Sequence, residues 1–345
     1  MSELPKELSS RPQDAVLPEE TSVGEALPTR EIGSEITETS AVLVVPIADP
    51  APQSPAPPSE DAPLLFQSFT RPIDRPHERI PHMGHIGILM LLALGCLAVA
   101  ALLARAAISY HFFGVTTLTE AANEIHYTLG TEAIFYLLTL CSSVLLFPLL
   151  WHRNFFAALQ WHAERARKYA GYLIGAAGVC FVLAMFDGML LPGPADAPID
   201  RIFRTPGAAW ILFAFGVTLA PFFEELAFRG FLLPALSTAF DWIAEKVTDE
   251  PPHPLDEYGH PQWSMPAMVV ASVIASLLFA ALHADQTGYS LGPFLLLVLV
   301  SLVLCVVRLG LRSLAASVLV HATYNFLLFS FMFFGTSGFR HLENM

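Results

Sequence analysis

Two adjacent carboxylates and one guanidinium interrupt an apolar stretch in the second half of the chain. Glu224 and Glu225 stand side by side, and Arg229 follows within AWILFAFGVTLAPFFEELAFRGFLLPAL, from Ala209 to Leu236. A carboxylate at the centre of a membrane helix costs roughly 2.5 to 3.5 kcal/mol, so such residues are by default functional candidates. Because residues four apart share a helix face, Glu225 can pair with Arg229 while Glu224 points elsewhere. The spacing predicts that Arg229 fixes Glu225 and that Glu224 is free to act as a general base.

Two histidines lie well inside later apolar stretches. Phe279 and His283 are four residues apart in SVIASLLFAALHADQ, and His321 and Asn325 are four apart in SLAASVLVHATYNFLLF. A single histidine on an apolar face is more often a satisfied core residue than a catalytic one. Two such histidines, together with the Glu-Glu-Arg helix, predict one shared site. The alternative is that the charged triplet only holds helices together.

The elements that carry these residues are membrane helices. The chain has 345 residues, of which 54% are hydrophobic and only 14% charged, whereas soluble domains have about 25% charged residues. We expect an all-α polytopic membrane protein with about seven transmembrane helices, or eight, and a catalytic cavity between them. Pro221 predicts a kink just before the acidic pair. The predicted spans are 84–106, 131–150, 170–192, 207–238, 265–284, 291–308 and 313–334.

Composition divides the chain into regions. Residues 1–82 are predicted to be a disordered, Pro-rich, acidic tail, because they contain too few large apolar residues to form a core. Accessory helices are expected over 83–206, the helices that carry the candidate site over 207–334, and a short C-terminal tail over 335–345. The net charge of −13 and the lack of a basic stripe argue against nucleic-acid binding. The N-terminal tail could bind a protein that the sequence does not identify.

The distribution of cations predicts the orientation of the chain. Lys and Arg gather at one set of predicted helix ends and are few at the other. The positive-inside rule then places the N-terminus in the cytoplasm. A bacterial inner membrane fits this chain better than an endoplasmic reticulum membrane.

The three motifs resemble those of a known family. EELAFR, FAALH and HATYN match, in order, the EExxxR, FxxxH and HxxxN motifs of the CPBP family, which contains the type II CAAX prenyl endopeptidases and bacterial Abi-type membrane proteins. The resemblance covers roughly residues 207–330. It implies an intramembrane endopeptidase, with a membrane-embedded or lipidated peptide or protein as its substrate in the lipid bilayer. Nothing in the sequence indicates that prenylation is recognised.

The resemblance also implies roles for the site residues. Glu224 and His283 would hold and deprotonate a water molecule that attacks the scissile carbonyl. His321 and Asn325 would donate hydrogen bonds to the oxyanion. Arg229, held by Glu225, would orient the acidic pair or bind a substrate carboxylate.

Other functions stay open at this point. A zinc-dependent protease could use Glu224, His283 and His321 as ligands. We favour a site without a cofactor, because there is no HExxH on one helix and the three ligands would come from separate helices. A proton-coupled transporter and a non-catalytic membrane scaffold are the remaining alternatives.

Overall fold

The computed structural model describes residues 79–191, 207–256 and 259–339. Of the predicted N-terminal tail only residues 79–82 are among them, and of the C-terminal tail only 335–339. The predicted disorder of residues 1–82 therefore falls almost wholly outside the described residues.

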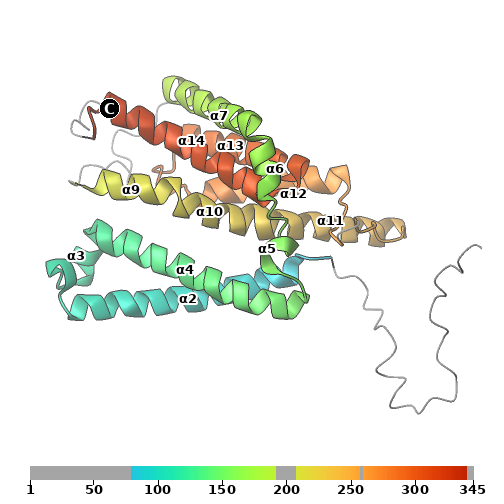
Figure 1. Cartoon of the computed structure of the whole chain (residues 1–345), viewed down its shortest axis with the longest axis horizontal. Coiled ribbons are helices and arrows are strands. Elements are labelled where there is room, and N and C mark those ends of the chain that lie inside the picture. Colours follow the sequence, from blue (N-terminus) through green and yellow to red (C-terminus); the bar gives the residue numbers. More distant parts are fainter. Residues whose placement is uncertain (1–78, 192–206, 257–258, 340–345) are drawn as a thin grey trace, which may run out of the picture. The chain divides into compact units, whose positions relative to one another are not determined.

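Helices make up the described part of the chain, and they confirm the predicted all-α membrane architecture (Figure 1). Seven of them are long and apolar enough to cross a membrane, so the count of seven holds for the described residues and the alternative of eight does not. Six spans are α2 (Met83–Ser109), α4 (Ile125–Trp151), α7 (Ala170–Leu190), α12 (Met265–Leu282), α13 (Leu291–Leu311) and α14 (Leu314–Gly335). The remaining span joins α9 (Ala208–Val217), α10 (Leu219–Glu225), η2 (Leu226–Leu232) and α11 (Leu233–Thr248). Short helices are η1 (Phe112–Gly114), α3 (Leu118–Asn123), α5 (Phe155–Ala158) and α6 (Ala163–Lys168).

Side-chain caps fix where two of the spans begin. The Ser264 hydroxyl accepts a hydrogen bond from the backbone N–H of Ala267 at the start of α12. The Ser313 hydroxyl does the same for Ala316 at the start of α14. Such caps satisfy backbone donors that have no partner within the helix. Arg312 ends α13 with a left-handed φ of 44°, so α13 and α14 are joined by a very short turn.

The composite span breaks where the sequence predicts a kink. Pro221 has no backbone N–H, so it cannot donate to the carbonyl of Val217 four residues earlier. The break lies at Thr218, whose φ of −115° and ψ of −73° separate α9 from α10. The Thr218 hydroxyl donates to Ala214 O at 2.6 Å. Just before the break, the carbonyl of Gly216 accepts a hydrogen bond from Asn325 Nδ2 of α14.

A π-helical segment follows the acidic pair directly. This segment, η2, contains Arg229 and Gly230. Segments of this kind are rare and occur frequently at functional sites. A Cβ atom added at Gly230 would lie 3.3 Å from Leu314 Cδ2, so glycine lets α14 approach closely. The spacing argument for Glu225 and Arg229 assumes an ordinary α-helix, whereas the structure has a π-helix here.

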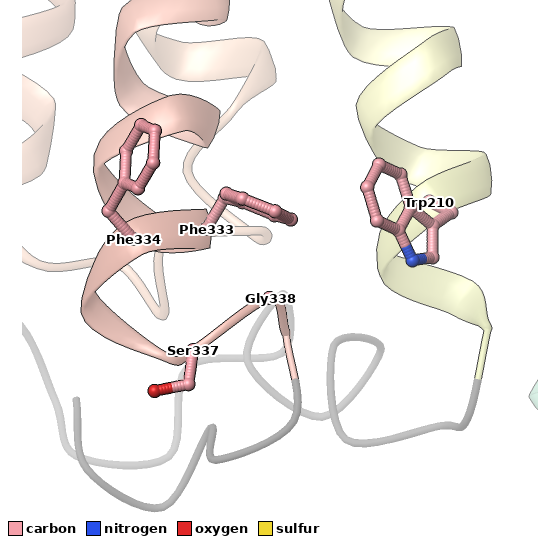
Figure 2. Close-up of a pocket in the computed structure, with 5 residues that line it drawn as sticks. All are labelled: Trp210, Phe333, Phe334, Ser337 and Gly338. Atoms are coloured by element: carbon pink, nitrogen blue, oxygen red, sulfur yellow. The ribbon is translucent and has the colours of Figure 1, made fainter.

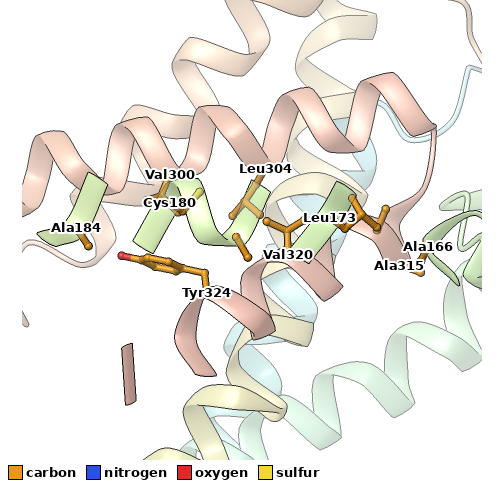
Figure 3. Close-up of a cluster of buried hydrophobic side chains, with 11 residues drawn as sticks. Ala166, Leu173, Cys180, Ala184, Val300, Leu304, Ala315, Val320 and Tyr324 are labelled. Carbon is orange, nitrogen blue, oxygen red and sulfur yellow. The ribbon is translucent and has the colours of Figure 1, made fainter. Parts of the chain in front are cut away.

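Small side chains let α7, α13 and α14 pack closely. Their shared core includes Ala177, Cys180, Leu304, Ala316 and Val320, all fully or almost fully buried (Figure 3). Small residues are typical of helix interfaces within membranes, because backbones can then approach each other. A second core, of aromatic residues, joins α4 and α5 to η2 around Phe147, Phe155 and Phe231. The second core thus contains residues of the composite span itself, including Phe223 and Leu226.

Large apolar side chains face outward on the two helices farthest from the candidate site in sequence. Leu91 and Leu102 on α2 and Leu145 and Leu149 on α4 are all well exposed. An exposed apolar surface of this extent is typical of a membrane-facing wall. The chain is an integral multi-pass membrane protein.

Close contact between α7 and α13 depends on Gly292. A Cβ atom added there would clash with the backbone oxygen of Leu191, at the end of α7, and would lie 2.7 Å from Leu191 Cβ. We expect Gly292→Ala to lower the free energy of unfolding by about 1–3 kcal/mol, because backbone would have to move. Gly310→Ala on the same helix is the matched control, since its added Cβ meets nothing within 4 Å. Thermal unfolding in detergent measures both, and equal melting temperatures would contradict the prediction.

Cationic side chains gather at one end of the bundle, here called the Arg79 end. Arg79 precedes α2, Arg153 follows α4, Arg165 lies in α6 before α7, and Arg312 follows α13. Arg79 pairs with Glu245 of α11 at 2.7 Å, and Arg312 with Asp256 at 3.2 Å. The antiparallel helices thus bring these residues to the same side, as the orientation argument requires.

Among the cavities lined by described residues, two lie at opposite ends of the bundle. One of about 410 Å³, lined by Trp210, Phe333, Phe334, Ser337 and Gly338, lies between the start of α9 and the end of α14 (Figure 2). The other, of about 910 Å³, lies at the Arg79 end between the start of α2 and α11, where Trp242 and Met83 line it. None of the predicted site residues lines either cavity. The predicted catalytic cavity between the helices stays a prediction.

Candidate active site

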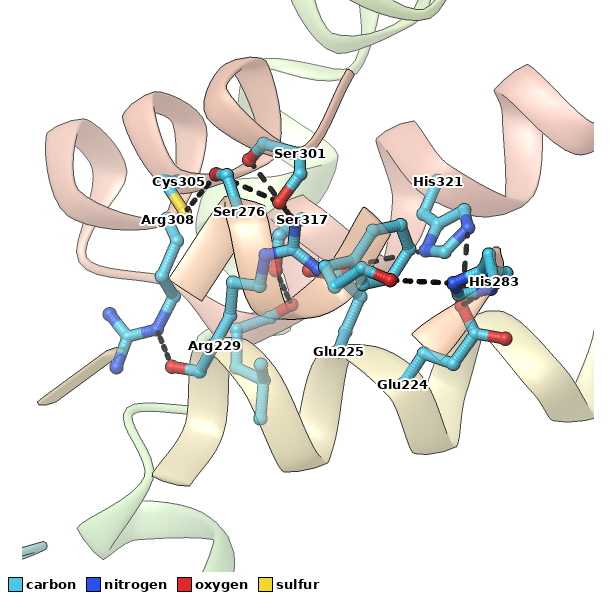
Figure 4. A network of polar contacts seen from close by, with 12 residues as sticks. Glu224, Glu225, Arg229, Ser276, His283, Ser301, Cys305, Arg308, Ser317 and His321 are labelled. Atoms are coloured by element: carbon cyan, nitrogen blue, oxygen red, sulfur yellow. Dashed lines mark hydrogen bonds and ion pairs between the residues drawn. The ribbon is translucent and has the colours of Figure 1, made fainter. Parts of the chain in front are cut away.

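The two adjacent glutamates point in different directions (Figure 4). Glu225 is completely buried, and its Oε1 accepts a hydrogen bond from Arg229 Nη1 at 2.8 Å. The Glu224 side chain keeps 21% of its surface exposed. The spacing argument predicted this division, in which one carboxylate is fixed by Arg229 and the other is free.

Arg229 is enclosed by protein on every side. Its Nη2 donates to Ser301 O at 3.1 Å and to Ser301 Oγ at 2.7 Å, and its guanidinium lies 4.8 Å from the centre of the Phe279 ring. Its side chain is 0% exposed. A substrate carboxylate cannot reach a guanidinium buried in this way. The described contacts of Arg229 match those of a residue that orients the acidic pair, and its role stays a prediction.

His283 caps the end of α12 beside Glu224. Its Nδ1 donates to Phe279 O at 2.8 Å. Its Nε2 lies 3.7 Å from Glu224 Oε2. Phe279 therefore supports His283 with its carbonyl and also packs its ring against the imidazole, at 4.6 Å between ring centres.

His321 contacts both glutamates through its two ring nitrogens. Nδ1 lies 3.0 Å from Glu225 Oε1, and Nε2 lies 3.7 Å from Glu224 Oε2. His321 is almost fully buried on α14, so its ring orientation is set by packing. The imidazole thus links the fixed carboxylate to the free one.

The hydrogen bonds determine which nitrogen of each histidine carries a proton. Phe279 O is a carbonyl and can only accept, and Glu225, paired with Arg229, acts as an accepting carboxylate. Both Nδ1 atoms must therefore donate. In the neutral imidazoles each Nε2 then presents a lone pair toward Glu224. Glu224 Oε2 and the two Nε2 atoms are thus three hydrogen-bond acceptors that lie close together. Three neighbouring acceptors attract a donor, such as a water molecule or a proton.

Asn325 lies apart from this cluster in its described contacts. Its Nδ2 donates to Gly216 O at 2.7 Å, at the break between α9 and α10. One turn of α14 separates it from His321. The structure thus brings Glu224, Glu225, Arg229, His283 and His321 together, and it places Asn325 against the broken helix.

Sequence reasoning missed several buried polar partners. Ser301 of α13 binds Arg229, and Ser276 of α12 accepts from Ser301 at 2.9 Å. Arg308 donates through Nε to Arg229 O at 3.1 Å and through Nη1 to Gln160 Oε1 at 2.8 Å. Arg308 thereby holds the π-helical turn in place. The available signal was that each of these residues is a polar residue inside, or at the edge of, an apolar block.

The donor set suits zinc, and the separations of its atoms are somewhat longer than those at a zinc ion, so the zinc alternative stays a prediction. Each histidine has its Nδ1 oriented by an acceptor, which is a common arrangement for zinc-bound histidines. Two ligands at tetrahedral zinc lie roughly 3.3 Å apart, because each bond is about 2.0–2.1 Å long. Both Nε2 atoms are 3.7 Å from Glu224 Oε2, and no group of three or more His, Cys, Asp or Glu among the described residues is arranged to hold a metal ion. We therefore derive no step through a metal.

Comparison with known proteins adds one finding. A family model described as type II CAAX prenyl endopeptidase Rce1-like matches residues 206–327. The matched segment runs from just before α9 into α14 and contains all six predicted site residues. No curated protein and no solved structure matches the chain.

Proposed function

We propose that this protein, which through residues 206–327 belongs to the CPBP family of type II CAAX prenyl endopeptidases, cleaves a peptide bond by means of a water molecule activated by Glu224. The substrate is a membrane-embedded or lipidated peptide or protein. One observation carries the proposal: the free carboxylate of Glu224 lies 3.7 Å from Nε2 of both His283 and His321. These separations exceed a direct hydrogen bond, so the three atoms are not bonded to one another and can all contact one water molecule placed beside them.

Hydrolysis on this geometry begins with general-base catalysis. Glu224 accepts a proton from the water, and the water oxygen attacks the scissile carbonyl carbon. His283, whose Nδ1 is held by Phe279 O, orients the water through its Nε2. Collapse of the tetrahedral intermediate breaks the C–N bond, and the proton held by Glu224 passes to the leaving amine. No covalent acyl intermediate forms.

The oxyanion needs hydrogen-bond donors, and α14 supplies two candidates. His321 can donate from Nε2 only when it is protonated, and its imidazolium would face Glu225 on one side and Glu224 on the other. Asn325 has a second amide N–H besides the one that binds Gly216 O. Both residues lie on the same face of α14, which supports a joint oxyanion role.

The same proposal includes the roles of the other regions of the chain, its orientation and its membrane. Residues 83–206 supply accessory helices, and 207–334 form the catalytic membrane region. The N-terminus lies in the cytoplasm, and the membrane is a bacterial inner membrane. The N-terminal tail is free to bind a further protein.

Cleavage assays test the proposal. Purified protein in detergent is incubated with membrane-tethered and prenylated peptides, with and without a strong chelator, alongside Glu224→Ala. We expect cleavage that is lost in Glu224→Ala and unaffected by the chelator. Loss of cleavage with the chelator would instead support the zinc-dependent alternative. A folded wild-type protein that cuts no peptide would contradict the peptidase and favour the transporter or scaffold.

A further inference from the structure

A carboxylate on α4 lies close to the site although it is outside the segment that matches the family. Glu132 is half-buried within an apolar span. The Tyr136 hydroxyl, one turn later, donates to Glu132 Oε1 at 2.8 Å. A carboxylate within a membrane span is costly, and this one is not part of the three motifs. It needs an explanation of its own.

Tyr136 fixes the position of Glu132 relative to the acidic pair. Its ring stacks on Phe223 with 4.7 Å between ring centres and on Phe215 at 5.9 Å. Phe215 belongs to α9 and Phe223 to α10, so Tyr136 covers the helix break. Phe223 is the residue directly before Glu224. The stack therefore holds this part of α4 against the segment that carries the general base.

The negative charge of Glu132 is near that of Glu224. Its partner Tyr136 stacks on Phe223, the neighbour of Glu224, which places Glu132 within electrostatic range of Glu224 and His283. The guanidinium of Arg229 is already engaged by Glu225, and within the described ranges no Lys or Arg forms an ion pair with Glu132. A carboxylate can accept about four hydrogen bonds, and the Tyr136 hydroxyl uses only one of these positions. Glu132 can accept a further, charged donor.

We propose that Glu132, oriented by Tyr136, is a substrate-binding residue that takes a cationic group of the peptide close to the scissile bond. The cation is an ammonium or guanidinium, either on a Lys or Arg side chain or at a free N-terminus. This inference rests on the proposed peptidase function and narrows its substrate class. By the same charge, a substrate carboxylate near the scissile bond is disfavoured.

A purely structural role makes a different prediction. If Glu132 only anchors Tyr136, then glutamine, whose amide oxygen also accepts from the phenol, replaces it without consequence. If Glu132 binds a cation, the same isosteric change removes the charge that the substrate needs. Glu132→Gln thus separates the two roles without removing the hydrogen bond to Tyr136.

Matched peptides provide the test. One membrane-tethered peptide is varied beside the cleaved bond as Lys, norleucine or Glu, and each version is made with a free or an acetylated N-terminus. For wild-type protein we expect kcat/KM for the Lys peptide to exceed that for the norleucine peptide by about tenfold or more. A hydrogen bond between charged groups contributes enough free energy for a ratio of that size. Glu132→Gln should abolish this preference. A preference for the free over the acetylated N-terminus would identify the amine as the cation instead.

Two further variants keep the test decisive. Tyr136→Phe retains the ring stack but loses the hydroxyl donor, so it should weaken charge discrimination while leaving the melting temperature nearly unchanged. Glu164→Gln, at an exposed position on α6, is the matched control and should keep the full preference. The same preference in wild type and Glu132→Gln would overturn the inference.

Binding distinguishes failure of this inference from failure of the proposed function. Dissociation constants for the same peptides are measured on Glu224→Gln protein, which lacks the general base, with and without Glu132→Gln. Tighter binding of the cationic peptide that disappears with Glu132→Gln supports the inference even if no peptide is cut. Cleavage without charge preference would leave the peptidase standing and overturn the role of Glu132. Equal affinity for all peptides, or no binding of any, would also overturn it.

Discussion

Glu224→Gln should lower kcat for peptide hydrolysis by roughly 10²- to 10⁴-fold, the contribution that a positioned general base makes. Glutamine keeps the size of the side chain and its exposure beside His283, but it cannot accept a proton from water. Because Glu224 is not part of the buried pair of Glu225 and Arg229, the variant should fold normally. Single-turnover cleavage in detergent isolates the chemical step, and KM should change much less than kcat.

Two comparisons make this result interpretable. Glu164→Gln makes the same chemical change at an exposed site and should retain wild-type kcat. The melting temperatures of both variants should match that of the wild type. If Glu224→Gln retained more than about a tenth of wild-type kcat, a general base that contributes at least 10²-fold would be excluded at this position.

Much of the fold follows from local sequence patterns. Each of the seven apolar blocks became a helix, because a bilayer leaves a spanning segment no other way to satisfy its backbone. The break before the acidic pair followed from Pro221, which cannot donate a hydrogen bond. The π-helical turn at Leu226–Leu232 was not predictable, because LAFRGFL has the composition of an ordinary helix. Its geometry depends on Arg308 of α13, which donates to Arg229 O from a residue distant in sequence.

In the candidate site, too, the sequence predicts contacts within one helix but not contacts between helices. The spacing of Glu225 and Arg229 predicted their ion pair, since both lie on one helix. The motif spacing joined His321 to Asn325, yet the described contacts of His321 are with the two glutamates, and those of Asn325 are with Gly216. Contacts between helices depend on how the helices rotate against each other, which local periodicity does not determine.

Glu132 illustrates a signal that was present and unused. Glu132 and Tyr136 are four residues apart inside a predicted span, the same spacing that identified the other pairs. Ser301 offered only a single polar residue in an apolar block, and nothing local indicated that it would face Arg229. Polar pairs at helical spacing are therefore detectable in such a chain, whereas their partners on other helices require the structure.

Arg229→Met should lower the free energy of unfolding by about 3–5 kcal/mol, because it leaves Glu225 buried without a cation. Glu225 is 0% exposed, so water cannot replace the guanidinium. The variant also loses the contacts of Arg229 with Ser301 and Phe279. Thermal unfolding in detergent should show a large fall in melting temperature, with cleavage lost at temperatures where the wild type is active.

A double variant separates charge from packing. Glu225→Gln with Arg229→Met removes both charges, and since replacing a whole buried ion pair is often nearly neutral, it should recover much of the lost stability. Activity should not return, because a neutral amide no longer stabilises the imidazolium form in which His321 would donate from Nε2 to the oxyanion. A double variant no more stable than Arg229→Met would show that the cost lies in lost packing. Recovery of stability without recovery of cleavage would show that the negative charge of Glu225 beside His321, and not only the stability of the pair, is needed for activity.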